Sequence, residues 1–584
     1  MRRMLSLLVV ASFAVVAPTA KEASAAPAGC GDVSTAGALF DEQLQPHIGN
    51  DRIPGAVVSV VSGGRTVFSK GYGLADVERQ TPMDPKTSGV RIASITKLFT
   101  YTAVMQQVEA GKLSLGADVN TYLTAFKIPA TFPQPITLLD LMNHTAGFED
   151  QIIGTGARTA ADVPPLGEFL AGHMPRRIRP PGQVSAYSNY GAALAGYIVA
   201  ETAHEPYDQY VQRHILDPLG MAHSSATEPP PFTPVRSYNT EEHPVRTVPF
   251  IFDPLTPDGA VTASADDLAE FMKAHLAGGG KLLSPATAQL MHTRSFAADP
   301  RLGGYAHGFQ DRTMNGHRVL MHDGGWEGFA SVLLLVPDCD LGLFLSFNST
   351  RAADAFGVVP AFLDRFAPKI TPSKVDAPAT GAPKPGFYAP TRHNDSTVEH
   401  LLMLLGPMRL TVAGDGTVHF KGHEYTDVGG GLYAQRDGDD HLVFRDGRVA
   451  TDGPEYELLG TTDSLPFNLI LLAVFVVVAL GTLVALRRRP LTAAASMLGV
   501  VFLALLTWAL GWHSRDFIYG APWWFQALLT LPVLVVVGFI AAVAEAIRGW
   551  ATTRPRGRIH QVVSLGGLAL ITWFFWNWNL FLAF

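Results

Sequence analysis

Residues 90–99 read VRIASITKLF and place Ser94 three positions before Lys97 at the start of an apolar helical segment. Side chains three positions apart lie on the same face of a helix, so the Lys97 amine would be close enough to accept the proton of the Ser94 hydroxyl. The apolar helical period continues after Lys97 and ends near Gly111. Ser94 would therefore lie near a helix N-terminus, where free backbone N–H groups stabilise negative charge. This pattern predicts a nucleophilic serine with a nearby amine.

The N-terminus has the pattern of a secretory signal peptide. Arg2 and Arg3 precede the apolar residues 5–16, and the small residues 23–25 follow. Signal peptides have a charged region, an apolar region and a small-residue cleavage site in this order. We therefore predict a signal peptide at residues 1–25. The alternative, an uncleaved anchor helix, is disfavoured because the apolar stretch is short for a bilayer.

The C-terminal part, residues 465–584, is predicted to be a transmembrane domain. It contains four long apolar segments, at residues 465–486, 491–512, 525–546 and 562–581. Each segment is long enough to cross a bilayer as a helix. Arginines cluster between the first two segments and between the last two, and arginine-rich loops stay in the cytoplasm. This topology predicts a bacterial inner (cell) membrane protein whose preceding region is periplasmic or extracellular.

Two extracytoplasmic units are expected before the membrane segments. The first covers residues 30–370, and residues 371–385, which are rich in Pro, Ala, Thr and Gly, form a predicted linker. Residues 386–460 alternate apolar and polar positions around the hairpin turn signals Asp415-Gly416 and Asp446-Gly447. This pattern predicts a small antiparallel β domain, with a role as a spacer or packing module favoured.

Composition limits the partners that we expect. The net charge is −7, and no basic stripe lies outside the membrane loops, so nothing in the sequence suggests nucleic-acid binding. None of the nineteen histidines falls in a His-Glu-x-x-His helix, so no metal and no cofactor are expected. The chain has two cysteines, Cys30 and Cys339. An exported location would permit them to pair, but the sequence leaves their pairing open, as it does the oligomeric state.

Three short motifs resemble those of a known superfamily. They are Ser94-Ile95-Thr96-Lys97, Tyr187-Ser188-Asn189 and His322-Asp323-Gly324, in this order along the chain. In order and spacing they resemble the motifs of the class C β-lactamase and serine-type D-peptidase superfamily, which also contains esterases. The resemblance covers about residues 36–366. It implies an α+β fold, in which an antiparallel sheet flanked by helices lies beside an all-helical lobe, with the active site between them.

The resemblance also implies roles for the motif residues. Ser94 would attack a carbonyl and form a covalent acyl-enzyme, and Lys97 and Tyr187 are both candidate bases. Asn189 would hydrogen-bond to Lys97 and to the substrate amide. His322 would orient or polarise Tyr187.

Two glycines and an acidic residue complete the predicted site. The N–H groups of Ser94 and Gly325 would form the oxyanion hole, and Asn189, Asp323 and Gly324 would contact substrate. The neighbours Asn143 and His144 are expected to be structural.

The residue at position 323 bears on the substrate. Penicillin-recognising members of the superfamily usually carry a hydroxyl residue there, which binds the substrate carboxylate, whereas this chain has Asp323. A second carboxylate would be repelled unless Asp323 turned away or were protonated. We therefore favour amide, peptide or ester substrates with a neutral or amine-bearing group near the scissile bond, as for a D-amino-acid peptidase or a precursor-maturing peptidase.

Three alternatives remain open. The chain could be a β-lactamase or D-Ala-D-Ala carboxypeptidase, for which only weak activity is expected. It could be a membrane-interface esterase that receives a lipidated substrate. It could also be a catalytically silent, penicillin-binding-like sensor.

Overall fold

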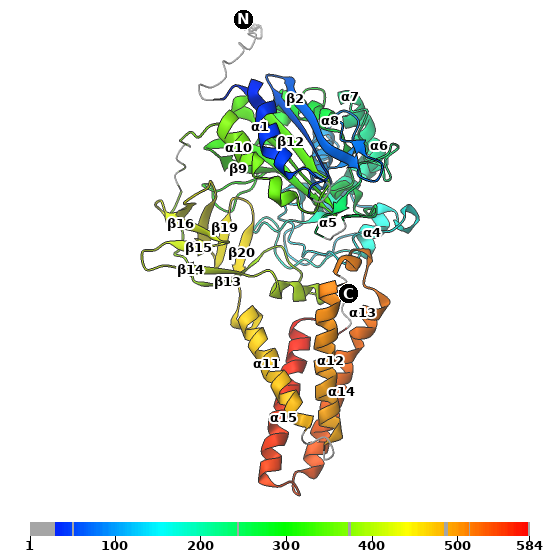
Figure 1. Ribbon diagram of the computed structural model, residues 1–584, viewed down its shortest axis with the longest axis vertical. Coiled ribbons are helices and arrows are strands. Elements are labelled where there is room, and N and C mark those ends of the chain that lie inside the picture. The colour runs from blue at the N-terminus through cyan, green and yellow to red at the C-terminus, as the bar shows by residue number, and fades with distance from the viewer. Residues whose placement is uncertain are drawn as a thin grey trace, which may run out of the picture.

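Three parts make up the molecule (Figure 1). The computed structural model describes residues 30–49, 52–241, 245–371, 375, 377–483, 489–512 and 514–581. A large domain with a central sheet lies at one end, a small β barrel lies beside it, and a bundle of long helices extends from both. The predicted signal peptide lies outside the described residues.

An antiparallel sheet of eight strands forms the centre of the large domain, in the order β3-β2-β1-β12-β11-β10-β9-β8. Its strands are β1 (Gly55–Ser62), β2 (Arg65–Asp76), β3 (Thr81–Pro82), β8 (Gly304–Ala306), β9 (Phe309–Met314), β10 (His317–Trp326), β11 (Phe329–Val336) and β12 (Leu341–Phe347). Ala56 of β1 lies opposite Phe347 of β12. Strands from the beginning and the end of the domain are therefore central neighbours.

Helices cover both faces of this sheet. α8 (Ala265–Leu276) packs on the face whose core continues into the helical lobe. α1 (Ala36–Leu44) and α10 (Val358–Phe366) cover the opposite face. Because successive side chains of a strand point to opposite faces, Val57 joins the first core and Val58 the second.

An all-helical lobe lies beside the sheet. Its helices are α2 (Thr96–Glu109), α3 (Leu138–Met142), α4 (Leu166–Gly172), α5 (Asn189–Ala203), α6 (Tyr207–Val211), α7 (Asp217–Leu219) and α9 (Pro285–His292). Two-stranded ribbons join β4 (Val90–Arg91) to β7 (Thr262–Ala263) and β5 (Tyr238–Asn239) to β6 (Arg246–Thr247). This arrangement confirms the predicted α+β fold.

The pairing of the cysteines, which the sequence left open, is present in the structure. Cys30 and Cys339 form a disulfide with their Cα atoms 5.6 Å apart. The bond ties the segment before α1 to the turn between β11 and β12.

The predicted small β domain is a closed barrel of eight strands. They are β13 (Gly386–Pro390), β14 (Met408–Val412), β15 (Val418–Phe420), β16 (His423–Asp427), β17 (Leu432–Gln435), β18 (His441–Arg445), β19 (Arg448–Thr451) and β20 (Glu455–Leu458). Aromatic side chains fill much of its interior, among them Tyr388, Phe420 and Tyr425. The predicted linker also contacts it, because Gly381 N donates to Phe444 O at 2.8 Å.

Four long apolar helical spans follow the barrel, as expected of a membrane protein. They lie at Leu465–Thr482, Pro490–Gly511, Trp523–Gly549 and Pro555–Asn577. The third comprises α13 (Trp523–Leu528) and α14 (Thr530–Gly549), and the others are α11 (Leu465–Thr482), α12 (Pro490–Trp512) and α15 (Pro555–Asn577). The last helix begins at Pro555, earlier than the predicted residue 562, because helical structure continues through Arg556 and Arg558.

Candidate active site

Ser94 lies on a strained turn between the sheet and the helical lobe. It belongs to the short helix η3 (Ala93–Ile95), which follows β4 and leads directly into α2. Ala93 has φ = 50°, a left-handed conformation that is costly for a residue with a Cβ atom. The turn leaves Ser94 half-buried, whereas its neighbours Ala93 and Ile95 are buried.

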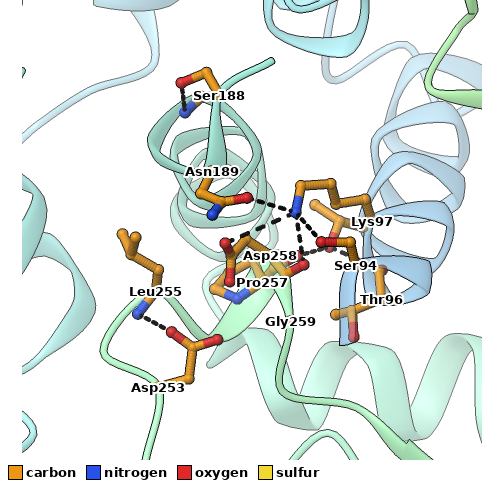
Figure 2. Close-up of polar contacts among 12 residues, drawn as sticks. Ser94, Thr96, Lys97, Ser188, Asn189, Asp253, Leu255, Pro257, Asp258 and Gly259 are labelled. Carbon is orange, nitrogen blue, oxygen red and sulfur yellow. Dashed lines mark hydrogen bonds and ion pairs between the residues drawn. The ribbon is translucent and has the colours of Figure 1, made fainter. Parts of the chain in front are cut away.

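The Lys97 amine is fully buried and surrounded by oxygen atoms (Figure 2). Its Nζ donates to Asn189 Oδ1 and to the main-chain oxygen of Asp258, each at 2.9 Å, and lies 3.0 Å from Ser94 Oγ. A neutral amine has two N–H donors and one lone pair. In the charged form all three N–H groups donate, the third to Ser94 Oγ. In the neutral form, with both donors used by Asn189 and Asp258, the lone pair would face the Ser94 hydroxyl. The structure therefore brings together the predicted residues Ser94, Lys97 and Asn189.

Burial also favours the neutral form of Lys97. Loss of solvation lowers the pKa of the amine, and the nearby Asp258 carboxylate opposes this shift only in part. The Asp258 Oδ2 atom lies 3.7 Å from Lys97 Nζ. Lys97 is thus better suited to accept a proton than an exposed lysine would be.

Tyr187 has the opposite tendency. Burial raises its pKa well above the usual value, and a hydrogen bond with Ser94 opposes this shift only in part. The phenol therefore keeps its proton at neutral pH. The Lys97 Nζ atom lies 4.9 Å from the ring centroid. Of the two candidate bases, Lys97 is the one whose pKa is shifted toward that role.

His144 forms one wall of the Tyr187 site. The two ring centroids are 4.3 Å apart, and His144 Nδ1 accepts a hydrogen bond from Ser188 N at 3.1 Å. His144 is buried and has φ = 57°. The sequence predicts a structural role for His144. Its contacts are of that kind, because they hold the ring of Tyr187 and the backbone of Ser188 in the second motif.

The third motif lies on β10, where the strand extends beyond its pairing with β9. His322 Nδ1 lies 2.6 Å from the main-chain oxygen of Asp323, so Nδ1 carries the proton. Burial lowers the pKa of His322 to about 4, and the ring is neutral. Its centroid is 6.1 Å from that of Tyr187, and among the described residues His322 Nε2 has no hydrogen-bond partner. Direct orientation of Tyr187 by His322 remains a prediction.

Asp323 is held as a carboxylate. Burial tends to raise its pKa, but His322 and a hydrogen bond from Gln310 outweigh this effect and lower it. Gln310 Nε2 donates to Asp323 Oδ1 at 2.7 Å. Protein atoms around the carboxylate remove part of its solvation, but the residue keeps exposed surface, so its negative charge lies at the open side of the site.

The two glycines after Asp323 have different surroundings. A Cβ atom on Gly324 would lie 2.2 Å from the main-chain oxygen of Ile92, whereas one on Gly325 would meet no atom within 4 Å. Gly324 therefore allows β10 to approach the turn that carries Ser94. The space beside Gly325 is open, and the oxyanion role of its N–H group stays a prediction.

Sequence reasoning missed a group of buried charges behind Lys97. Besides Asp258, it contains Asp253, whose pKa is raised well above the usual value by burial and by Asp258. Arg91 Nη2 lies 2.8 Å from Glu228 Oε1 and 3.6 Å from Asp253 Oδ2. These residues follow no motif, and only the folded chain brings them to Lys97.

The barrel also reaches the site. Thr391 Oγ1 donates to Ser185 O at 2.5 Å, and Ser185 N donates to Glu455 Oε1 at 2.9 Å. Arg392 Cζ lies 5.1 Å from the ring centroid of Tyr187. A role as a spacer does not account for these contacts.

A cavity of about 520 Å³ borders the opposite side of the third motif. Its wall includes Trp326, which directly follows Gly325, and also Phe250 and Phe329. Arg91 Cζ stacks 3.9 Å from the Trp326 ring. Within the part of the chain that the structure describes, no group of three or more His, Cys, Asp or Glu side chains is arranged to hold a metal.

Comparison with known proteins gives a consistent family match. The family model described as Beta-lactamase matches residues 39–362, more than half of the chain. Protein flp from Staphylococcus aureus (strain N315) is 27% identical over 322 residues, or 53% of this chain and 62% of flp. The putative penicillin-binding protein PbpX from Bacillus subtilis (strain 168) is 34% identical over 251 residues, or 42% of this chain and 60% of PbpX. The chain thus spans about three-fifths of the length of these relatives.

Solved structures share the fold. An octameric penicillin-binding protein homologue from Pyrococcus abyssi matches with a TM-score of 0.50 at 21% identity, covering 73% of this chain and all of that one. SurE matches with a TM-score of 0.52 at 23% identity, covering 73% of this chain and 98% of SurE. A structure of SurE with D-Leu gives 0.51 at 22% identity, covering 73% of this chain and 99% of that one.

Proposed function

The chain belongs to the β-lactamase family, and from this premise we propose that it is a membrane-anchored serine hydrolase that cleaves amide, peptide or ester bonds through an acyl-enzyme. The observation that carries the proposal is the environment of Lys97, whose Nζ lies 3.0 Å from Ser94 Oγ while Asn189 and Asp258 occupy its donors. In its neutral form, which burial favours, this amine is a base for the serine hydroxyl.

In the first step, Lys97 Nζ takes the proton of Ser94, and Ser94 Oγ forms a bond to the substrate carbonyl carbon. The N–H groups of Ser94 and Gly325 stabilise the resulting oxyanion. Tyr187 then gives its proton to the leaving atom as the bond to that atom breaks, and the Lys97 ammonium returns a proton to Tyr187. In the second step, water attacks the carbonyl carbon of the acyl-enzyme with the same proton transfers, and the bond to Ser94 Oγ breaks and releases Ser94.

The charge of Asp323 supports a substrate with an amine near the scissile bond. Asp323 is a carboxylate whose Oδ1 is fixed by Gln310. An ammonium group would be attracted to it, whereas the carboxylate of a penicillin would be repelled. This favours a peptidase for amino-acyl substrates over a β-lactamase or a D-Ala-D-Ala carboxypeptidase. The shared fold with SurE, which has been solved with D-Leu, is consistent with D-amino-acyl substrates.

We place the catalytic domain outside the cytoplasm. The Cys30–Cys339 disulfide favours an oxidising compartment. The connection between α14 and α15 lies at the end of the bundle away from the catalytic domain (Figure 1). Arg554 lies in the turn, and the adjacent helix ends carry arginines at 548, 556 and 558. Arginine-rich turns stay in the cytoplasm.

A membrane-interface esterase is the second candidate. The segment Val398–Leu404 packs Val398, Leu401 and Leu404 against the membrane helices. Leu402 and Leu405 are exposed beside it. This segment would bring the site close to a lipidated substrate.

The test is intact-mass analysis of the full-length protein in detergent after exposure to a fluorophosphonate, and then to D- and L-amino-acyl esters and amides. We expect the wild type to form one adduct and the Ser94→Ala variant none, with amine-bearing D-amino-acyl compounds turned over fastest. A folded wild type that no reagent labels would contradict the proposal and favour a silent sensor. Faster turnover of long-chain esters would favour the esterase.

A further inference from the structure

We propose that Arg392, supplied by the barrel, is a binding residue for a carboxylate on the substrate. This inference rests on the proposed function and adds to it a substrate class, namely short peptides that carry a carboxylate on the leaving-group side as well as an amine.

Arg392 lies at the reacting groups although it belongs to a different domain. Its Cζ is 5.1 Å from the Tyr187 ring centroid. Tyr187 is the proposed donor of a proton to the leaving atom, so a group above its ring lies beside the leaving group. Asp323 repels a carboxylate placed at the third motif, as that of a penicillin would be, so the carboxylate proposed here would have to lie at Arg392 instead, beside Tyr187.

The backbone around Arg392 is fixed on the catalytic domain. Thr391 Oγ1 donates to Ser185 O at 2.5 Å, and Asp150 N donates to His393 O at 2.9 Å. Arg392 Nε donates to Asp150 Oδ2 at 2.8 Å. A side chain held this way loses little further freedom when a ligand binds.

Comparison with Arg179 shows that Arg392 keeps binding capacity. Arg179 uses Nε and Nη2 on Glu457 and Nη1 on Thr391 O, and its side chain is 10% exposed. Arg392 is 40% exposed and, among the described residues, makes its one side-chain hydrogen bond through Nε. Arginine presents its N–H groups as a planar fork that matches a carboxylate. The terminal nitrogens of Arg392 can therefore bind a carboxylate while Nε keeps Asp150.

The test measures how well ligands protect Ser94 from a fluorophosphonate, using the full-length protein in detergent. One matched pair is D-alanyl-glycine and its C-terminal amide, which differ by a carboxylate on the leaving-group side. The other pair is N-succinyl-D-alanine amide and N-acetyl-D-alanine amide, which differ by a carboxylate on the acyl side. We expect the free dipeptide to protect the wild type at an approximately 10-fold or greater lower concentration than its amide, since one charge-assisted pair is worth about a factor of 10 or more.

The variants separate binding from folding. Arg392→Gln should abolish the preference for the carboxylate, and Arg392→Lys should keep part of it, because the charge remains without the fork. Arg213→Gln, which removes an exposed arginine paired with Glu205 in the helical lobe, should change neither the labelling nor the preference. Thermal unfolding of each variant checks that the barrel stays folded.

Each outcome is decisive. A preference that survives Arg392→Gln, or that is present only in the acyl-side pair, overturns the inference. Equal protection by dipeptide and amide in the wild type also overturns it. Failure of the fluorophosphonate to label the wild type would instead contradict the proposed hydrolase, so the two failures are distinguishable.

Discussion

The Lys97 Nζ atom donates to the main-chain oxygen of Asp258 at 2.9 Å and lies 3.7 Å from the carboxylate of the same residue. Asp258 therefore acts on the amine in two ways. Its main-chain oxygen positions the nitrogen, and its carboxylate raises the pKa of Lys97 against the larger effect of burial.

Asp258→Asn should separate these two effects. The substitution keeps the main-chain oxygen and removes the charge, so the Lys97 ammonium loses stabilisation and its pKa falls further. Because only the neutral amine accepts the Ser94 proton, the acidic limb of the labelling rate against pH should move to lower pH by roughly half a unit or more. Asp253→Asn is the graded comparison and should move the limb less, since Asp253 acts on the pKa of Lys97 in the same direction as Asp258 but more weakly. A limb that moves to higher pH would refute this view of Lys97.

Gly324→Ala and Gly325→Ala form a second matched pair. A Cβ atom on Gly324 would lie 2.2 Å from a main-chain oxygen of Ile92, which cannot move without shifting the turn that carries Ser94. We expect Gly324→Ala to lower the free energy of unfolding by about 2 kcal/mol or more. Gly325→Ala should change it by about 0.5 kcal/mol or less, because its Cβ atom enters open space. Thermal unfolding of the two variants checks this difference, and equal losses would argue against the close approach of β10.

His322 should make the folded protein sensitive to acid. Its pKa in the folded state is about 4, mainly because of burial, against the usual 6.5. Between these pH values the unfolded chain binds the proton and the folded chain does not, so stability falls as the pH decreases from 6.5 to 4. The loss for this residue is up to about 3 kcal/mol. His322→Gln should flatten this part of the stability curve, and an unchanged slope would show that His322 does not cause it.

Glu399 should make the folded protein less stable as the pH rises, which is opposite to the effect of His322. Burial raises its pKa to about 7, and its oxygens accept hydrogen bonds from Ile152 N and Ile153 N at 2.8 and 3.0 Å. Above about pH 4.5 the unfolded state releases a proton that the folded state keeps. The contribution of Glu399 to the free energy of unfolding is therefore complete below that pH and is lost as the pH rises through 7.

Glu399→Gln should therefore raise the unfolding temperature more at pH 8 than at pH 5. The exposed Glu42 offers a control, because its conversion to Gln should have no such effect. A larger increase of the unfolding temperature at pH 5 than at pH 8 would contradict the raised pKa of Glu399.

The three motifs were predictable because each is local. Ser94 and Lys97 are three positions apart on one helical turn, and Tyr187 and Asn189 are two positions apart at the start of α5. Spacing alone places Ser94 and Lys97 on a common face, and the short sequence separation of Tyr187 and Asn189 keeps these two residues close together. Burial on both faces of the central strands is likewise visible as a mostly apolar run, as in β1, which Ser59 interrupts.

Asp258 and Arg392 were not predictable for the same physical reason. Asp258 is 161 positions from Lys97, and Arg392 reaches Tyr187 only because the barrel docks on the segment around Ser185. Neither contact leaves a periodic trace in the sequence. Closure of the barrel also depends on pairing between β13 and β20, which lie at its two ends in the sequence. Turn signals indicate hairpins but not which distant strands meet.

The pairing of β1 with β12 also sets the order in which the protein can be completed during synthesis. In an exported domain, Ala56 has to wait for Phe347 to cross the membrane before the sheet acquires its central pair, and Cys30 waits in the same way for Cys339. Until then β1 has only the hairpin with β2 as a neighbour, and an apolar edge is exposed. A newborn chain stalled before residue 341 should therefore be the species that most needs a chaperone.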